Sequence, residues 1–367
     1  MTERTVYNKH NTGHLRGHFP AFLGEDMGIG SDVEVTFPEI NELKEKQRAA
    51  FWQAAEVSMD DSRVGMETSD PVAVELMKLN LMFQQGLDSV ASKSIGAMLL
   101  PHVTNPEVGS MIMEWGRSES VHMDSYSYIL RSVFDDPSKI IEEIYDDLEI
   151  HSRIEGITEV FDDLYNTHPS DPLEVKKVNI ARALVVLMAM EGCAFMNSFS
   201  VTFAVEEATK SMGGIAETVS RICFDEGLHS IMSYHLIQAT IKDGWGYVYE
   251  KIKPEMEGVY KNIVENELKW ADYLFSGNRS RGISGLTKDM MYDQVYFFAN
   301  NVYNMAGFDN PFKVVEEIAI KAFDKHVDRE AIQVSPQELT NTSYFVNAVV
   351  DDLTGDSDIS FKGNSVF

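Results

Sequence analysis

The chain has 367 residues, which allows one large domain or two ordinary ones, and its apolar fraction of 44% is enough for a sizeable core. A formal net charge of −27 argues against direct binding of nucleic acid, because the phosphates would be repelled. The acidity also serves solubility, so it does not identify a partner. Leu, Met, Ala, Glu and Lys are common and Gly/Pro clusters are sparse, which favours an all-α fold.

The N-terminal part is expected to be irregular before the helices begin. Residues 1–40 are rich in Gly, Pro, His and Asn, and the first ten lack the apolar stretch of a secretory signal. A first helix is predicted over 39–55. Asp70 followed by Pro71 is the pattern of an N-cap with a first-turn proline, and it opens a helical run that ends near Leu100.

Three more long helical runs follow. Asn105-Pro106 repeats the cap signal and predicts a helix to about Phe134. Asp171-Pro172 opens a third run that ends at Gly213-Gly214. The other predicted helices are, in chain order, shorter amphipathic ones within 138–165, a fourth long run over about 215–242, and helices over 246–275 and 286–329.

The last part of the chain differs from the rest. From Pro336 onward, Asp and Gly stand among few large apolar residues, which predicts a flexible tail over 336–367 after a single domain over 1–335. The most apolar stretch, 183–190, lies between Arg182 and Glu191 and is too short to span a membrane, so we expect no membrane contact. Two cysteines, Cys193 and Cys223, in apolar helical contexts fit a reducing cytoplasm.

One motif occurs twice and carries most of the chemistry. It reads Glu119-Ser-Val-His122 and again Glu226-Gly-Leu-His229. Residues at i and i+3 share a helix face, so each copy directs one carboxylate and one imidazole to the same point. Each copy follows a lone acid in an apolar helical stretch: Asp88 lies 31 residues before Glu119, and Glu191 lies 35 residues before Glu226. The four segments fall one on each long run.

Together these residues supply four carboxylates and two imidazoles. That is the ligand set of a carboxylate-bridged dimetal site inside a four-helix bundle. Iron and manganese accept such mixed ligands, and coordination would offset the cost of burying charged acids. Each motif alone is weak, and a lone buried acid is more often a satisfied polar core residue. The joint pattern of two motifs and two acids on four long helices favours the dimetal site.

Several neighbours are in register with these ligands. Tyr126 lies at i+4 from His122 and points to the metals from the same face. Phe195 and Phe199 lie at i+4 and i+8 from Glu191, and Ile222 lies at i−4 from Glu226. The three apolar side chains would form a dry pocket around the Tyr126 phenol. An ordinary core tyrosine packed by aromatic side chains is the alternative explanation.

Asp225 points off the ligand face by about 100°, because successive helical residues are rotated by that angle. It is predicted either to contact a metal ligand without binding the metal itself, or to be a helix-surface acid. Trp52 and Trp115 are expected, from the residues alone, to be core side chains.

The chain resembles the small (beta) subunit of class I ribonucleotide reductase, most closely the class Ia type. The resemblance runs from about Phe51 to Tyr344 and centres on Ser118-Glu-Ser-Val-His-Met-Asp-Ser-Tyr126. The other matching segments are Phe51-Trp52, Gly86-Leu-Asp-Ser89, Glu191-Gly-Cys-Ala-Phe-Met-Asn-Ser-Phe199, Phe224-Asp-Glu-Gly-Leu-His229, Trp270-Ala-Asp-Tyr-Leu-Phe275 and Pro336-Gln-Glu-Leu-Thr-Asn-Thr-Ser-Tyr344.

The resemblance implies a ferritin-like helical bundle with extra helices, in a homodimer with two iron ions per chain. Manganese or a mixed manganese–iron pair would suit the same ligands. Molecular oxygen would oxidise Tyr126 to a stable radical. The radical would then be relayed to the large (alpha) subunit, which reduces ribonucleotides to deoxyribonucleotides.

By position, the resemblance implies that the radical is transferred through His122, Asp225 and Trp52 to Tyr344 on the tail. Glu338 would support the transfer step on the tail. The C-terminal end, Val366-Phe367, would dock on the large subunit.

Two other functions share parts of this pattern. A stand-alone di-iron oxidase or hydroxylase would use the same ligands but would need neither Trp52 nor a tail tyrosine. A ferritin-like iron-binding protein is usually shorter than this chain. Neither alternative accounts for Tyr126 in register with the ligands.

Overall fold

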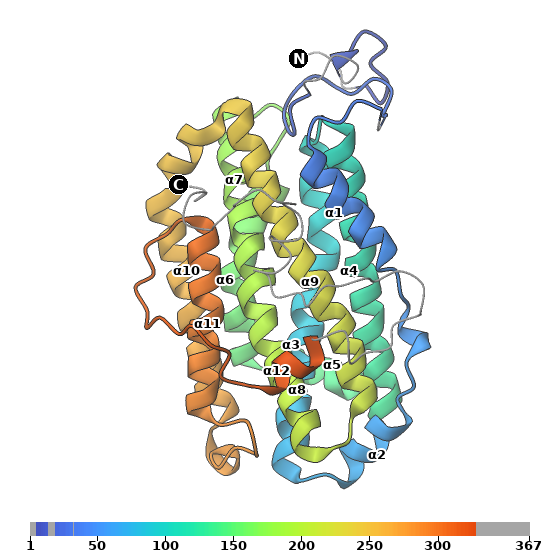
Figure 1. The fold of residues 1–367 in the computed structure, drawn as a ribbon, viewed down its shortest axis with the longest axis vertical. Helices are drawn as coiled ribbons and strands as arrows, with labels where there is room; N and C mark the ends of the chain where they lie inside the picture. The colour runs from blue at the N-terminus through green and yellow to red at the C-terminus, as the bar shows by residue number, and fades with distance from the viewer. Residues whose placement is uncertain (1–4, 14–18, 32, 328–367) are drawn as a thin grey trace.

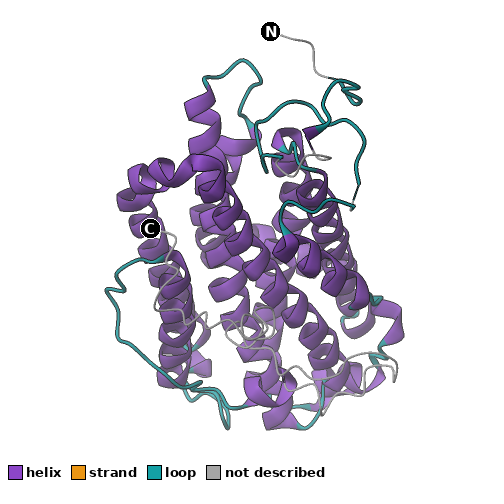
Figure 2. Cartoon of the chain, turned by 45° about the horizontal axis from the view of Figure 1, so that its top comes forward, coloured by secondary structure: helices purple, strands orange, loops and turns teal. Residues whose placement is uncertain are grey.

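The computed structural model describes residues 5–13, 19–31 and 33–327. These residues form helices and connecting loops, with only isolated β-bridges among them (Figure 2). The α-helices are α1 (Pro38–Ala49), α2 (Asp60–Thr68), α3 (Pro71–Ser94), α4 (Pro106–Val133), α5 (Pro137–Asp146), α6 (Leu148–Tyr165), α7 (Leu173–Ala189), α8 (Met196–Thr209), α9 (Gly213–Thr240), α10 (Gly246–Leu274), α11 (Lys288–Ala306) and α12 (Ala322–Val327). The prediction of an all-α fold is confirmed.

Four long elements enclose the centre of the molecule. Helix α3 packs on α4 and α8, and α9 packs on the same two helices, which closes a four-helix ring (Figure 1). Helix α1 covers α4 and α9, while α6, α10 and α11 pack against α7. The extra helices bury the outer faces of the ring, and the interior of the protein holds buried acids and histidines as well as apolar side chains.

The cap signals act as predicted at two of the long helices. Asp70 accepts a hydrogen bond from the Val72 backbone N–H at 2.8 Å, and Asn105 accepts one from Val108 at 3.0 Å. The third long run also opens where predicted, but Asp171 is not its cap. Asp171 accepts a hydrogen bond from the backbone N–H of His168 and makes no cap for α7. Helix α7 begins at Leu173 after Pro172, whose fixed φ suits the start of a helix.

Two predicted helical regions are too long. The helix predicted over 39–55 ends at Ala49, and the chain then passes through residues 50–53 into a short 3₁₀ turn at Ala54–Glu56. The helical region predicted over 286–329 is only partly helical: α11 ends at Ala306, because Gly307 takes a left-handed conformation with φ 70°. Only the short α12 follows it within the described residues.

The first described segments form the irregular arm that the composition predicts. The arm is fastened where α1 begins: the Glu107 carboxylate accepts hydrogen bonds from the backbone N–H groups of Thr36 at 2.6 Å and Phe37 at 2.7 Å. Glu107 belongs to the first turn of α4, so one buried acid ties the start of α1 to the start of α4.

The run Leu173–Thr209 is long and apolar enough to cross a membrane by length and composition. Its most apolar window is 83% buried inside the protein, as in a core helix. The predicted boundary between 335 and 336 lies outside the described residues.

Candidate metal centre

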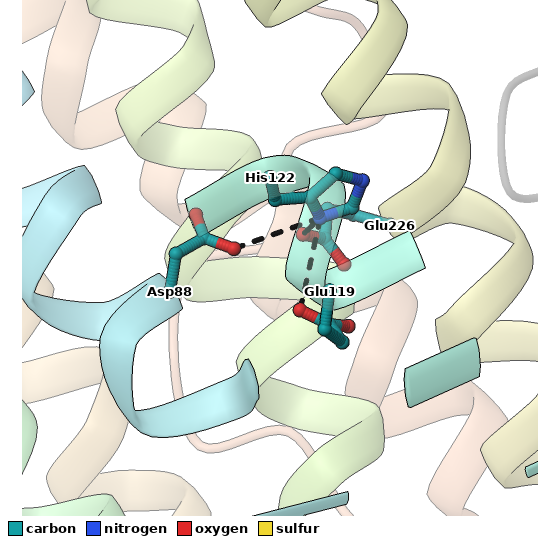
Figure 3. Close-up of side chains that lie close together, drawn as sticks. All are labelled: Asp88, Glu119, His122 and Glu226. Atoms are coloured by element: carbon teal, nitrogen blue, oxygen red, sulfur yellow. Dashed lines mark ion pairs between the residues drawn. The ribbon is translucent and has the colours of Figure 1, made fainter. Parts of the chain in front are cut away.

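All six predicted metal ligands converge in the middle of the four-helix ring. Each comes from the expected element: Asp88 from α3, Glu119 and His122 from α4, and Glu226 and His229 from α9. Glu191 comes from the segment η5 (Met190–Phe195), a π-helical turn that joins α7 to α8. All six are fully buried. Figure 3 shows the carboxylates of Asp88, Glu119 and Glu226 gathered around the His122 ring.

The ligand atoms form two overlapping groups. One contains Asp88, Glu119, His122 and Glu226, and the other contains Glu119, Glu191, Glu226 and His229. In each group the ligand atoms lie within 4.8 Å of one another. Glu119 and Glu226 belong to both groups, so these two carboxylates stand where bridging ligands would stand.

The distances support the bridging roles. Glu226 places one oxygen 3.0 Å from His122 Nδ1 and the other 2.8 Å from His229 Nδ1. Glu119 does the same, at 3.7 Å from His122 Nδ1 and 2.9 Å from His229 Nδ1. A carboxylate that turns one oxygen to each of two imidazoles can bind one cation with each oxygen.

The electrostatics of the cluster fit two divalent cations. Both carboxylate oxygens of Asp88 and of Glu191 are buried without a hydrogen bond in the part of the chain that the structure describes. Such atoms are costly unless a proton or a cation neutralises them. Four ionised carboxylates and two neutral imidazoles carry four negative charges, which two divalent cations balance. Carboxylate and imidazole together are the donor set of iron and manganese.

Without cations, protons take over part of this neutralisation. Burial, together with the nearby charge of Glu226, raises the pKa of Glu191 well above its usual range. Burial likewise raises the pKa of Asp88. Burial opposes the charge of His229, but Glu119 and Glu226 outweigh it and raise the pKa of His229 to about 9. The metal-free cluster therefore holds protons at neutral pH.

The π-helical turn at Glu191 is a feature that the sequence did not predict. It widens the helix at the ligand and carries Phe195 at its end. Gly192 lies against α9 and α11: a Cβ atom there would lie 2.8 Å from Ser230 Oγ and 2.8 Å from Val302 Cγ1. The sequence did contain a signal for this turn, namely a glycine next to a lone acid in an apolar run. Such a position is a candidate for a π-turn, because π-turns are frequent at functional sites.

Tyr126 lies one turn after His122 and is fully buried. Its hydroxyl has no hydrogen-bond partner among the described residues. Burial, and then the charges of Asp88 and Glu226, raise the pKa of this hydroxyl well above its usual range, so the phenol stays protonated. The predicted pocket residues Phe195, Phe199 and Ile222 are fully buried in the same core. The Phe195 and Phe199 rings are stacked, with centroids 5.7 Å apart.

Asp225 is buried and contacts the predicted ligand His122, so it is not a helix-surface acid. Its Oδ2 lies 3.1 Å from His122 Nε2, and the same oxygen accepts a hydrogen bond from Trp52 Nε1 at 2.9 Å. Burial opposes the charge of Asp225, but the contacts with His122 and Trp52 outweigh it and lower its pKa. Asp225 therefore connects Trp52 to the ligand cluster.

Other partners of the ligands emerged only from the structure. Trp115, expected to be a core residue, is buried and also donates a hydrogen bond to Glu119 Oε1 at 2.8 Å. Its ring stacks on His229 with centroids 5.1 Å apart. Ser118 and Gln47 both contact Asp225, and neither was singled out from the sequence. The predicted tail residues Glu338, Tyr344, Val366 and Phe367 lie outside the described residues.

Comparisons with known proteins identify a family for the chain. The family model described as "Ribonucleotide reductase, small chain" matches residues 33–317. Ribonucleoside-diphosphate reductase 1 subunit beta of Escherichia coli O157:H7 is 27% identical over 365 residues, covering 94% of this chain and 96% of that protein. The ribonucleoside-diphosphate reductase subunit beta of Enterobacteria phage T4 is 24% identical over 391 residues, covering 98% of this chain and 99% of that protein.

Solved structures share the fold. The ribonucleotide reductase R2 subunit from Clostridium botulinum superposes with a TM-score of 0.75 at 19% identity, covering 89% of this chain and 98% of that one. The dimanganese(II) NrdF protein of Streptococcus sanguinis superposes with a TM-score of 0.65 at 17% identity, covering 80% of this chain and 98% of that one. These neighbours confirm the ferritin-like helical fold.

Metal binding is predicted to release protons and to strengthen as the pH rises. The raised pKa values of Asp88, Glu191 and His229 mean that protons compete with cations for the cluster. For His229, this competition fades as the pH approaches its pKa of about 9. Titration of the metal-free protein with Mn²⁺ at about pH 6.5 and about pH 8.5, with a pH indicator present, measures both effects. Equal affinity at the two pH values, without proton release, would contradict the prediction.

The same shifts predict how pH affects the stability of the metal-free protein. A histidine with a raised folded-state pKa stabilises the fold fully below its ordinary value of 6.5, and this stabilisation is lost as the pH rises towards about 9. Burial of Asp88 and Glu191 acts in the same direction, because both acids must ionise at a cost. Thermal melting should show the metal-free protein losing stability over this window, while the metal-loaded protein loses less.

Gly192→Ala is predicted to weaken both folding and metal binding. The added methyl group would meet Ser230 and Val302, and overpacking of this kind costs about 1–3 kcal/mol. Because Glu191 precedes Gly192 in η5, the shift should lower metal affinity. Gly258→Ala on α10 is the matched control: its methyl group would meet open space and should leave metal binding unchanged. Parent-like metal affinity in Gly192→Ala would show that this close packing does not position Glu191.

Proposed function

The chain belongs to the family of ribonucleotide reductase small chains, and on that premise we propose that it is the small subunit of a ribonucleoside-diphosphate reductase. In this role it would generate a radical on Tyr126 and relay it to a large subunit that reduces ribonucleotides to deoxyribonucleotides. The observation that carries the proposal is the pair of overlapping ligand groups that share Glu119 and Glu226, with Tyr126 one turn after the ligand His122.

Asp88, Glu119, His122, Glu191, Glu226 and His229 would hold two metal ions per chain. We propose iron, while the same ligands accept manganese or a mixed pair. When bound, the metal pair would supply, with molecular oxygen, the oxidising power that removes one electron and the phenolic proton from Tyr126. The neutral form of the buried phenol and the absence of a hydrogen-bond partner for its hydroxyl among the described residues suit a radical that has to persist.

His122, Asp225 and Trp52 would form the first part of the relay. His122 turns Nδ1 toward Glu226 and the ligand cluster, and Nε2 toward Asp225. When Nδ1 coordinates a cation, Nε2 must carry the ring proton, so His122 then donates to Asp225 Oδ2. Trp52 Nε1 donates to the same oxygen. The buried carboxylate thus links a redox-active indole to a ligand through two hydrogen bonds.

The partners follow from the family. We propose a homodimer that works with a large (alpha) subunit, which it contacts through residues 336–367. Tyr344 and Glu338 on that segment would continue the relay, and Val366-Phe367 would provide the apolar contact. The domain over 1–335 would carry the metal and radical chemistry. A cytoplasmic location fits the two buried cysteines, neither of which forms a disulfide within the described residues. We propose no direct contact with nucleic acid or membranes.

Tyr126→Phe tests the proposal directly. The variant should bind two metal ions per chain, because the phenol is not a ligand. It should give no tyrosyl signal in electron spin resonance after iron loading and exposure to oxygen. It should retain almost no nucleotide reduction with the cognate large subunit, because phenylalanine is far harder to oxidise. A persistent tyrosyl signal would move the radical to another residue.

The double variant Glu119→Ala, Glu226→Ala is the complementary control. It removes both bridging candidates, so metal analysis should find far less than two ions per chain. Full occupancy would contradict the ligand assignment. A chain that oxidises a small substrate without any large subunit would favour the stand-alone oxidase instead.

Removal of residues from Asp351 onward should abolish nucleotide reduction but preserve folding, metal binding and the Tyr126 radical. Few core-forming residues are lost, whereas the apolar end Val366-Phe367 is needed for docking.

Tyr344→Phe should have a different effect from the truncation. Docking should survive, because one hydroxyl contributes little to an interface, while turnover should stop. Binding and turnover can be measured separately with the large subunit. A truncated chain that still turns over would refute the docking role, and a fully active Tyr344→Phe would refute the relay role.

A further inference from the structure

The carboxylate of Asp225 is held by more groups than the two that form the relay. Its Oδ2 contacts Trp52 Nε1 and His122 Nε2 and accepts a third hydrogen bond from Ser118 Oγ at 3.2 Å. Its Oδ1 accepts one from Gln47 Nε2 at 3.0 Å. Groups on α1 and α4 and in the segment after α1 therefore surround this one buried acid of α9, whose two oxygens have different partners.

Gln47 reaches Asp225 from α1 and is itself buried. Its Nε2 donates to Asp225 Oδ1 and also lies 3.1 Å from Ser118 Oγ. Its Oε1 is buried without a partner among the described residues. The reversed amide would turn its carbonyl toward the Asp225 carboxylate, so the charge of Asp225 selects the orientation with the N–H groups inward.

An unpaired buried carbonyl has a free-energy cost that an apolar side chain of similar size would avoid. Two hydrogen bonds donated by Gln47 Nε2 offset this cost. One goes directly to Asp225, and the other goes to Ser118, which itself donates to Asp225. A carboxylate rotates easily about its last bond, because that torsion has broad wells. Because both oxygens turn together about that bond, the hydrogen bond to Oδ1 resists a rotation that would draw Oδ2 away from Trp52 and His122.

We propose that Gln47 is a positioning residue for the relay, which with Ser118 clamps the Asp225 carboxylate. The clamp occupies Oδ1, and Oδ2 alone then faces both the Trp52 indole and the His122 ring. The purpose of the clamp rests on the function proposed above. Its existence does not, because the hydrogen bonds can be tested without turnover.

A second buried glutamine provides a matched control. Gln84 on α3 is fully buried, donates to Thr202 Oγ1 at 3.2 Å, and also has an Oε1 without a partner among the described residues. In the described part of the chain, its side chain forms no hydrogen bond with Asp225, Trp52 or Ser118. Gln47→Leu and Gln84→Leu therefore delete the same kind of buried amide, and only the first removes a contact to Asp225.

The indole N–H of Trp52 is the direct probe of the clamp. The chain has four tryptophans, so the full-length protein prepared without metal should give a few indole ¹⁵N–¹H signals, and Trp52→Phe identifies the Trp52 signal by its loss. Gln47→Leu should move that signal by more than its linewidth, since the hydrogen-bonded oxygen is no longer fixed. Ser118→Ala should move it in the same direction. Gln84→Leu should leave it in place. An unmoved signal in Gln47→Leu, or an equal shift in Gln84→Leu, would overturn the clamp.

Turnover separates the clamp from the relay. With iron loading and the cognate large subunit, Gln47→Leu should keep the metal content and Tyr126 radical of the parent but lose turnover roughly tenfold to a hundredfold, as expected for a misplaced group. Gln84→Leu should turn over like the parent. Parent-like turnover in Gln47→Leu alone would overturn the positioning role. Parent-like turnover in Trp52→Phe would instead overturn the relay proposed above, and the indole signal of Gln47→Leu would still decide whether the clamp exists.

Discussion

The burial of four carboxylates close together is the constraint that shapes the other parts of this structure. Asp88, Glu119, Glu191 and Glu226 are all fully buried, and a helical bundle offers them almost no backbone donors, because helical N–H groups are already used. Their mutual repulsion has to be neutralised by protons or by cations. The two imidazoles and the overlapping ligand groups let two divalent cations do this without leaving excess charge. The architecture around the site serves to hold repelling groups together.

The surrounding contacts show how that repulsion is contained. Trp115 donates to Glu119 and stacks on His229, and Asp225 holds the outer nitrogen of His122. Such outer contacts orient the ligands before any cation binds. They also differ in character: Trp115 is enclosed in the core, whereas Trp52 stands next to Phe51, whose side chain is exposed. Of the two indoles beside the cluster, Trp52 is therefore the one next to an exposed side chain, which suits the relay role proposed for it.

The chain departs from regular α-helix at two places beside the cluster. The helix that carries Glu191 widens into the π-turn η5, and Gly192 lets that turn approach α9 and α11 closely. Helix α1 ends at Ala49, short of its predicted end, and the chain then leaves the helix so that Trp52 reaches Asp225. Both departures from regular helix occur beside the site, where bonding to distant groups outweighs local helix propensity.

The sequence by itself predicted the long helices, their caps at Asp70 and Asn105, and the six acids and histidines that converge in the cluster, because these depend on spacing within a turn or on the four residues at a helix start. Periodicity also placed Tyr126 on the ligand face. Only the tertiary structure decided which carboxylates lie in both ligand groups, where α1 ends, and which of two roles Asp225 has. It also revealed Gln47, which is 178 residues from its partner Asp225. No local pattern encodes such a contact, because it forms only when α1 is packed across α4 and α9.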